Sequence, residues 1–447
     1  MNSPTKSPPV ARMPHLRRLG ILLVIASLLA IGFATLLPED GRPIPSLCII
    51  CGTVGGVDAI LNVLLFVPLG VGLALSNVRG RIAIPTMVAL SLSIELAQLI
   101  AIPGRDASLG DLLTNTAGGA LGFALCVNTS RWLRPSARTA TRLAIAWCSL
   151  WLGIQTAASF GFSPALPPSR YYGQIARPLE IFARFEGKVL AAKIGNQDVP
   201  DREFSNSAKV RHELKGHASI MATVLAAQPT QDLAPIIRIA DDQKREILML
   251  AQDRRSLVFG IRTGAALLRL RQPLFALRGV FPDSTGRGSL TQNDTVQLEG
   301  RYAATHVELR AGESSRTLAH AFRIGPALGW TLIAPTQWYI DGRSTELIVT
   351  WLWSFGLILP LGFWMSHALS SPSGRPRRKA LVLRAAIGVF ALTIGLIFIP
   401  LAFGLAPAAF SDWLAVVGGI GTGWFLGQRL GSAPNGSPIA REGHIGR

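Results

Sequence analysis

The chain has 447 residues, of which 49% are hydrophobic and only 16% are charged. This composition is too apolar and too lightly charged for an ordinary soluble enzyme of this length. The formal net charge is +18, but the basic residues lie in short segments between apolar runs and no nucleic-acid-binding motif occurs. We therefore expect the charge to orient the chain in a membrane, with no nucleic acid as partner.

Apolar runs long enough to cross a membrane recur along the chain, since a spanning helix needs about 20 such residues. The sequence predicts eight, in chain order, at 19–37, 57–75, 82–102, 111–128, 141–160, 347–369, 381–403 and 411–428. The fourth begins with polar residues, and the eighth is short and rich in glycine. The first could be a signal peptide, but "IGFATLLPED" offers no convincing cleavage site, which favours an uncleaved helix.

The basic residues favour one orientation of these helices. In an eight-helix arrangement one face carries five segments, with two to four basic residues in each: 1–18, 76–81, 129–142, 370–380 and 429–447. The loops of the opposite face hold at most one each: 38–56, 103–110 and 404–410. The positive-inside rule then predicts a multi-pass membrane protein with both tails, 1–18 and 429–447, in the cytoplasm.

The middle segment, 161–346, contains no spanning run and alternates with a period of two. Runs such as "APIIRIADD", "REILMLAQD", "SLVFGIRTG" and "ATHVELRAG" are separated by Gly, Asp, Gln and Pro. This pattern predicts an extracytoplasmic antiparallel β-sandwich or jelly roll. The expected fold class is a polytopic α-helical membrane protein in which this domain separates five helices at 19–160 from three at 347–428.

The spans also indicate an internal repeat. "NVLLFVPLGVGL" at 62–73 resembles "SFGLILPLGFWM" at 354–365. In each unit the third helix begins with an acid, in "DLLTNTAGGALG" and "DWLAVVGGIGTG". The second copy lacks counterparts of Glu95, Gln98 and Asn115, so we expect it to be structural.

Polar residues gather near the expected outer ends of the second, third and fourth spans. The binding residues predicted there are Asp58, Asn62, Glu95, Gln98, Arg105, Asp111 and Asn115. Spacings of three or four residues put 58/62, 95/98 and 111/115 each on one helix face. Short loops favour antiparallel packing of neighbouring helices. We therefore predict a shared polar pocket that opens to the exterior, with membrane lipid around it.

Most of these residues also have a structural explanation. Asp58 and Asp111 lie near helix N-termini, where a carboxylate caps N–H groups, and Ser108 and Asp111 have a capping-box spacing. The two asparagines could hold helices together, and Arg105 could be an interfacial anchor. Glu95 differs, because it lies towards the C-terminal end of its helix, where the dipole disfavours a negative charge. A buried carboxylate costs on the order of 2.5–3.5 kcal/mol, so Glu95 needs a partner, and Arg105 is the nearest in sequence.

The segments "D-A-I-L-N-V-L-L-F-V-P-L-G", "E-L-A-Q" and "G-R-D-A-S-L-G-D-L-L-T-N-T-A-G-G-A-L-G" together resemble the VanZ-like family, which is named for a glycopeptide (teicoplanin) resistance membrane protein. The matching positions are Asp58, Asn62, Phe66, Pro68, Gly70, Glu95, Gln98, Arg105, Asp111, Asn115, Gly118, Gly119 and Gly122. The resemblance covers about 57–125. It implies a setting, the bacterial cell envelope and its inner membrane, rather than a reaction.

The expected β domain resembles concanavalin A-like or laminin-G-like jelly rolls in the runs "SIMATVL", "PIIRIA", "EILMLAQD" and "LVFGIRT". Such a resemblance implies binding of a glycan, sometimes with calcium. The available acids Asp241, Asp242 and Asp253 do not have the spacing of a calcium loop and are expected in turns.

Two cysteines of the first outer loop, Cys48 and Cys51, form a C-x-x-C motif. They could form a local disulfide or remain free thiols. The seven histidines are scattered without ligand spacing, so we expect no metal. The sequence has no P-loop, G-x-S-x-G or Rossmann fingerprint, and no cofactor is expected.

Three functions stay open at this level. We favour a non-enzymatic envelope protein that recognises an envelope glycan, a glycopeptide antibiotic or a lipid-linked precursor through its outer sandwich and the outer-leaflet polar cluster. The second is an intramembrane enzyme acting on a lipid-linked precursor, with Glu95 as the candidate catalytic acid or base and Arg105 holding a phosphate. The third is a transporter built from the two repeats, and the missing polar residues of the second copy weigh against it.

Overall fold

The computed structural model describes residues 14–38, 47–179, 182–225, 229–281, 295–313, 316–369 and 378–431. The chain divides into two compact units. The first unit comprises Met1–Val127, Ile154–Thr350 and Ile394–Ala408. The second unit comprises Asn128–Gly153, Trp351–Thr393 and Ala409–Arg447. Much of the two basic tails and of the loop around Arg375 lies outside the described residues.

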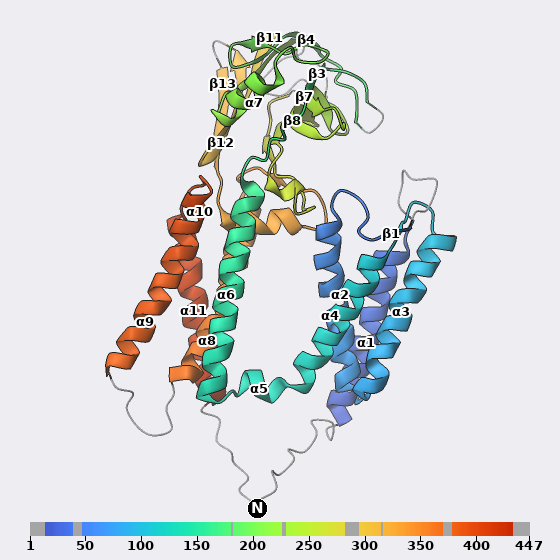
Figure 1. The fold of residues 1–447 in the computed structure, drawn as a ribbon, viewed down its shortest axis with the longest axis vertical. Coiled ribbons are helices and arrows are strands. Elements are labelled where there is room, and N and C mark those ends of the chain that lie inside the picture. Colours follow the sequence, from blue (N-terminus) through green and yellow to red (C-terminus); the bar gives the residue numbers. More distant parts are fainter. Residues whose placement is uncertain are drawn as a thin grey trace, which may run out of the picture. The chain divides into compact units, whose positions relative to one another are not determined.

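Helices form at every apolar run that the sequence predicts (Figure 1). In chain order the long ones are α1 (Pro14–Leu36), α2 (Gly55–Leu75), α3 (Gly80–Ala101), α4 (Leu109–Val127), α6 (Ala137–Phe162), α8 (Ser344–Leu369), α9 (Arg378–Thr393) and α11 (Phe410–Gly431). A short helix, α5 (Thr129–Leu133), precedes α6, and a π-helical turn (Ile394–Phe398) leads from α9 into α10 (Ile399–Ala402). Among the described residues five helices, α1, α2, α3, α6 and α8, are long and apolar enough to cross a membrane. The count of eight spans stays a prediction.

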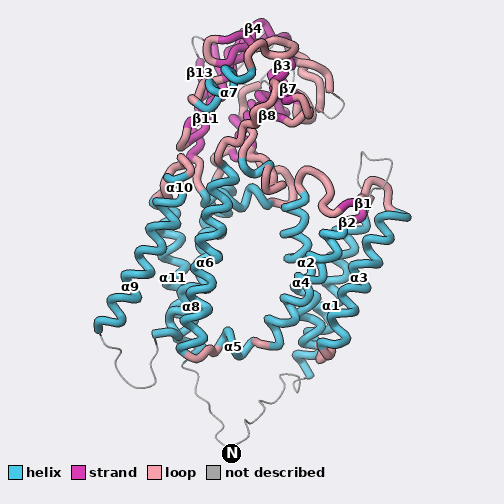
Figure 2. The backbone as a smooth tube through the Cα atoms, in the orientation of Figure 1, coloured by secondary structure: helices cyan, strands magenta, loops and turns pink. Residues whose placement is uncertain are grey.

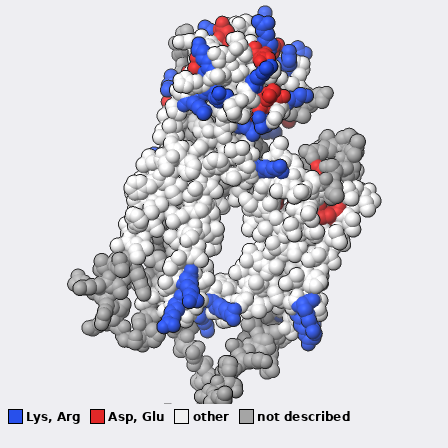
Figure 3. Space-filling view, in the orientation of Figure 1, with Lys and Arg blue, Asp and Glu red and all other residues white. Residues whose placement is uncertain are grey.

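The outer surfaces of these helices are apolar. Leu22, Phe33 and Ile100 are 63%, 74% and 79% exposed, and Figure 3 shows helix surfaces largely free of charged side chains, with basic side chains at helix ends. Exposed apolar area of this extent is unfavourable in water and suits contact with hydrocarbon. The helices are therefore those of a membrane protein.

Helices α2 and α4 pack with their backbones in close contact. A Cβ on Gly118 would collide with the carbonyl oxygen of Val63, and one on Gly122 with that of Val67. From the other side, a Cβ on Gly70 would meet the backbone of α4. These glycines occur because only a hydrogen atom fits between the two helices.

Helices α8 and α11 repeat this packing. A Cβ on Gly419 would collide with the carbonyl oxygen of Phe355, and one on Gly423 with that of Leu359. Gly362 of α8 meets the backbone of α11 as Gly70 meets that of α4. The spacing of the contacting residues is the same in both pairs, so the packing agrees with the internal repeat suggested by the shared Pro-Leu-Gly.

Aligning the two copies on these glycines shows which polar residues the second copy keeps. Four positions correspond: Asp58 to Thr350, Asn62 to Ser354, Asp111 to Asp412 and Asn115 to Val416. Only the acid at the start of the last helix is retained, and Asp412 caps its own helix by accepting the backbone N–H of Ala409. The polar cluster is thus a property of the first copy.

Two six-stranded sheets lie between α6 and α8 in the chain (Figure 2). Sheet A has the order β14 (Tyr339–Ile340), β10 (Leu274–Leu277), β9 (Ser256–Ile261), β8 (Glu246–Asp253), β7 (Ala234–Asp241) and β3 (Tyr171–Ile175). Sheet B has the order β13 (Arg316–Arg323), β12 (His306–Glu313), β11 (Thr295–Ala303), β6 (Ile220–Leu225), β4 (Lys188–Ile194) and β5 (Gln197–Asp198). All neighbouring strands are antiparallel except β10 and β14. The prediction of antiparallel sheets is confirmed, while the jelly-roll relationship stays a prediction.

The two sheets share one apolar core. Residues such as Ile239 and Phe259 of sheet A and Val224 and Leu309 of sheet B are almost fully buried in it. The other face of sheet A carries a second apolar cluster around Met249. Strands buried on both faces explain why "PIIRIA" and "EILMLAQ" are nearly continuous hydrophobic runs.

Candidate functional site

Glu95 is buried, with 7% of its surface exposed. Its Oε2 accepts a hydrogen bond of 2.7 Å from the backbone N–H of Ser108, the residue before α4. Ser108 Oγ in turn accepts the backbone N–H of Asp111 at 3.2 Å, as the capping-box spacing predicts. Glu95 therefore lies near the end of its own helix but at the N-terminus of the next one, where the dipole favours a carboxylate.

The end of α1 is held by two of the predicted site residues. Arg105 donates from Nε to the carbonyl of Leu37 and from a terminal nitrogen to that of Ala34, both at 3.2 Å. Gln98 donates from Nε2 to the carbonyl of Thr35 at 2.9 Å. Carbonyls in the last turn of a helix lack partners within the helix. These two side chains supply them.

The remaining predicted residues join α2, α3 and α4. The side chains of Asn62, Asp58 and Arg105 lie close enough to Asp111 to act on its carboxylate. Asn115 donates to Ser91 Oγ at 3.0 Å, one turn before Glu95 on α3. The structure thus brings the predicted residues of these helices to one end of the bundle, while Gln98 turns towards α1.

Two buried acceptors in this cluster have no hydrogen-bond partner among the described residues. They are Gln98 Oε1 and Asn115 Oδ1. Both amides use their nitrogens for contacts between helices. These two oxygens can therefore accept further hydrogen bonds. The hydrogen bonds described above, in contrast, hold neighbouring segments of the protein together.

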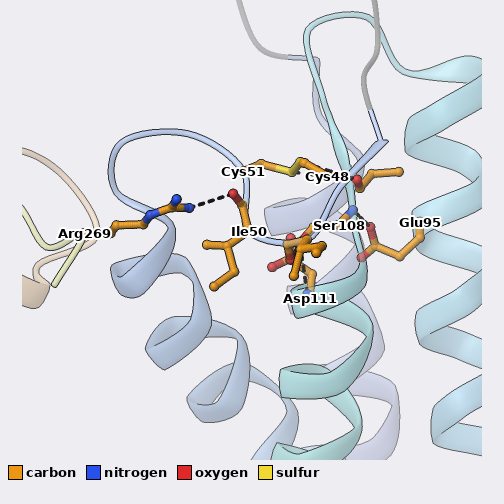
Figure 4. The surroundings of a disulfide bond; sticks show 9 residues. Cys48, Ile50, Cys51, Glu95, Ser108, Asp111 and Arg269 are labelled. Atoms are coloured by element: carbon orange, nitrogen blue, oxygen red, sulfur yellow. Dashed lines mark hydrogen bonds between the residues drawn. A yellow bond between two sulfur atoms is a disulfide. The ribbon is translucent and has the colours of Figure 1, made fainter. Parts of the chain in front are cut away.

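A disulfide between Cys48 and Cys51 closes the first loop over the start of α4 (Figure 4). The strand β1 (Leu47–Cys48) pairs in parallel with β2 (Ala107–Ser108). The carbonyl of Ile49 accepts hydrogen bonds from Ser108 Oγ at 3.1 Å and from the Gly110 N–H at 2.8 Å. Glu95 and this loop therefore hold the same short segment from opposite sides.

Arg269, which follows sheet-A strand β9, contacts the other side of this loop. Its guanidinium donates to the carbonyl of Ile50 at 2.8 Å (Figure 4), and its own carbonyl accepts the N–H of Gly56 at 3.0 Å. A Cβ on Gly56 would collide with the backbone of Leu268. No sequence motif marks Arg269, and the capping-box spacing of Ser108 with Asp111 does not reveal that Ser108 is the partner of Glu95.

A groove of about 1460 Å³ opens beside this contact, on the face of sheet A that is turned away from the shared core. Its apolar lining includes Met249, Leu274, Phe182 and Tyr339. One part of its wall is formed by Gly52, Thr53 and Val54 of the first loop. The groove is thus lined jointly by sheet A with its connecting loops and by the loop that precedes α2. Residues 13–132 match the VanZ/LLP1 family model.

This VanZ-like domain contains α1–α4, the disulfide loop and all the binding residues predicted from the sequence. No curated protein and no solved structure matches the chain. Among the described residues no group of three or more His, Cys, Asp or Glu is arranged to hold a metal ion.

Proposed function

We propose that this chain is a non-enzymatic VanZ-like protein of the bacterial envelope. It binds an envelope glycan, a glycopeptide or a lipid-linked precursor in the groove of its sheet domain. The observation that carries the proposal is the composition of the groove wall, which joins sheet A to the first loop of the VanZ-like domain. Concave sites with apolar floors and a few polar groups are the usual form of ligand sites.

The contacts of the polar cluster support binding over catalysis. Glu95, Gln98 and Arg105 each hydrogen-bond to the backbone of a neighbouring segment. A general acid or base has to reach a proton on its substrate, whereas one carboxylate oxygen of Glu95 already accepts the hydrogen bond from the backbone N–H of Ser108. The role that we assign to the cluster is to fix the first loop, which forms part of the groove wall.

The sidedness of the protein is part of this proposal. We place both tails in the cytoplasm and the sheet domain outside, as the alternating basic segments predict. The disulfide supports this assignment, because disulfides persist in oxidising compartments such as the bacterial periplasm.

A pair of matched substitutions tests the proposal. Gln243 is exposed and lines the groove, whereas Gln297 is exposed on sheet B and does not. Full-length protein in lipid nanodiscs is titrated with a glycopeptide, a polyprenyl-linked sugar and a soluble cell-wall glycan. We expect at least one ligand to bind, Gln243→Trp to weaken it about tenfold or more, and Gln297→Trp to leave it unchanged.

Three results would count against the proposal. One is that none of the ligands binds, and another is that the two tryptophan variants bind equally well. The third is turnover of the lipid-linked precursor that disappears in Glu95→Gln, which would establish the enzyme instead.

A further inference from the structure

Positive charge predominates in the groove. Three acidic residues line it, Asp232, Glu246 and Asp253. Seven basic residues do so: Arg238, Lys244, Arg245, Arg254, Arg262, Arg269 and Arg271. The lining therefore has a surplus of four positive charges, which favours an anionic ligand.

Internal contacts neutralise only part of this charge. Arg245 pairs with Asp241 at 2.7 Å, and Arg238 with Glu246 at 3.5 Å. By contrast, Arg269 and Arg271 donate to backbone carbonyls, of Ile50 at 2.8 Å and of Ala334 at 2.5 Å. A carbonyl fixes a guanidinium in place without removing its charge, so these side chains are preorganised cations.

Two of the guanidinium groups lie in each other's field. Burial lowers the pKa of Arg262, and the positive charge of Arg245 lowers it further. Asp241, the partner of Arg245, offsets part of this effect on Arg262, and an arginine remains protonated in spite of such a shift. A bound anion beside Arg262 would interact favourably with its guanidinium.

The groove offers more than charge. Its floor is apolar, and its volume of about 1460 Å³ exceeds the roughly 300–1,000 Å³ of ordinary small-molecule pockets. Its wall at Gly52–Val54 directly precedes α2, one of the helices that can cross a membrane. The ligand therefore combines a negative group with an apolar or sugar part and is within reach of the membrane surface.

We propose that this groove binds the phosphate headgroup of an anionic lipid, with the phosphate on the arginines and the adjoining part of the molecule on the apolar floor. The inference rests on the proposed function and deepens it by naming the class of ligand. A lipid-linked precursor carries the same chemistry, because its lipid and sugar are joined through phosphate.

The test compares two double variants with equal loss of charge. Arg254→Gln with Arg262→Gln removes two cations from the groove. Lys193→Gln with Arg310→Gln removes two exposed cations from sheet B. The full-length protein, in nanodiscs of phosphatidylcholine, is titrated calorimetrically with short-chain phosphatidylglycerol, with phosphatidylcholine of the same chain length, and with inorganic pyrophosphate.

We expect phosphatidylglycerol to bind about tenfold or more tightly than phosphatidylcholine, and to bind less tightly as salt is added. The groove variant should lose about tenfold or more of this affinity, and the sheet-B variant less than about twofold. Equal thermal unfolding of the two variants shows that folding is not the cause.

Several outcomes would overturn the inference. They are equal affinity for the two lipids, equal loss in both double variants, and pyrophosphate that binds as tightly as phosphatidylglycerol. If Gln243→Trp removes binding of an envelope ligand while the groove charge variant does not, the proposed function stands and the phosphate assignment fails. If neither variant changes any binding, both fail.

Discussion

At the scale of single residues, Glu95 shows how a costly side chain is accommodated. The carboxylate is unfavourable at the end of α3, yet the chain turns back within a few residues and places the N-terminus of α4 beside it. The partner is a backbone N–H, and Arg105 satisfies carbonyls of α1 instead. The favourable interaction of the Glu95 carboxylate with the dipole of α4 thus offsets its unfavourable interaction with the dipole of α3.

Removing the acceptor should destabilise this corner of the bundle. In Glu95→Ala the buried N–H of Ser108 loses its partner, so we expect the free energy of unfolding to fall by about 1–3 kcal/mol. Glu95→Gln keeps an acceptor oxygen and should lose less. Leu96→Ala, at a lipid-facing neighbour, is the control for truncation on α3. Thermal unfolding in detergent measures all three, and an unchanged midpoint for Glu95→Ala would refute the capping role.

At the scale of elements, the close approach of α2 to α4 and of α8 to α11 depends on glycine. The same spacing of glycines and carbonyls occurs in both pairs, although the polar residues around them differ. The glycine packing is therefore retained in the second copy, whereas the counterparts of Asp58, Asn62 and Asn115 are not. A helix pair of this kind holds by van der Waals contact, which any added carbon atom disturbs.

Alanine substitutions test this packing. Gly118→Ala and Gly419→Ala each place a methyl group against a backbone carbonyl, so each should lower the free energy of unfolding by about 1–3 kcal/mol. Gly153→Ala is the matched control, because its Cβ meets no atom within 4 Å and alanine favours helix. Equal stability of all three variants would contradict the inference that both helix pairs depend on glycine for their close packing.

The disulfide loop is the second element with a measurable contribution. The bond between Cys48 and Cys51 closes a ring of only four residues, for which chain entropy gives about 2 kcal/mol. We expect Cys48→Ser with Cys51→Ser to unfold at a lower temperature than the wild type. A reductant should lower the wild-type midpoint and leave the double variant unaffected. A wild-type midpoint insensitive to reductant would show that the ring does not stabilise the loop.

At the scale of the whole molecule, the two copies differ in role. The first carries the polar cluster, and the sheet domain precedes the second in the chain, between α6 and α8. We expect the second copy to serve as an anchor, since Thr350, Ser354 and Val416 replace the acid Asp58 and the two amides of the first. The assignment of the second copy as an anchor assumes that the sheet domain lies on the outer side of the cell membrane.

Cysteine labelling in intact cells tests the sidedness. In a background with Cys126→Ala and Cys148→Ala, an impermeant maleimide should label Asp242→Cys, a position exposed in the sheet domain, without permeabilisation. Ser136→Cys, before α6, should react only after the membrane is opened. The reverse pattern would invert the orientation.

The sequence predicted those parts of the fold that leave a local pattern. Helices follow from the length of the apolar runs, and the strands from "REILMLAQD" and its neighbours, whose hydrophobic residues recur between turn residues. The partner of Glu95 could not be predicted, because it depends on the turn before Ser108. The contact between Arg269 and Ile50 joins segments more than two hundred residues apart and has no motif. The groove is built from several such contacts, so it becomes visible only in three dimensions.

The peptide units of Ile49 and Ile50 mark where the VanZ-like domain meets the sheet domain. One carbonyl is bonded to the start of α4, and the next to Arg269. The two domains are in direct contact at this point, where Ile50 and Gly56 both hydrogen-bond to Arg269. The VanZ-like domain and the sheet domain consequently form one continuous surface there, and a bound molecule resting on Thr53 would touch both.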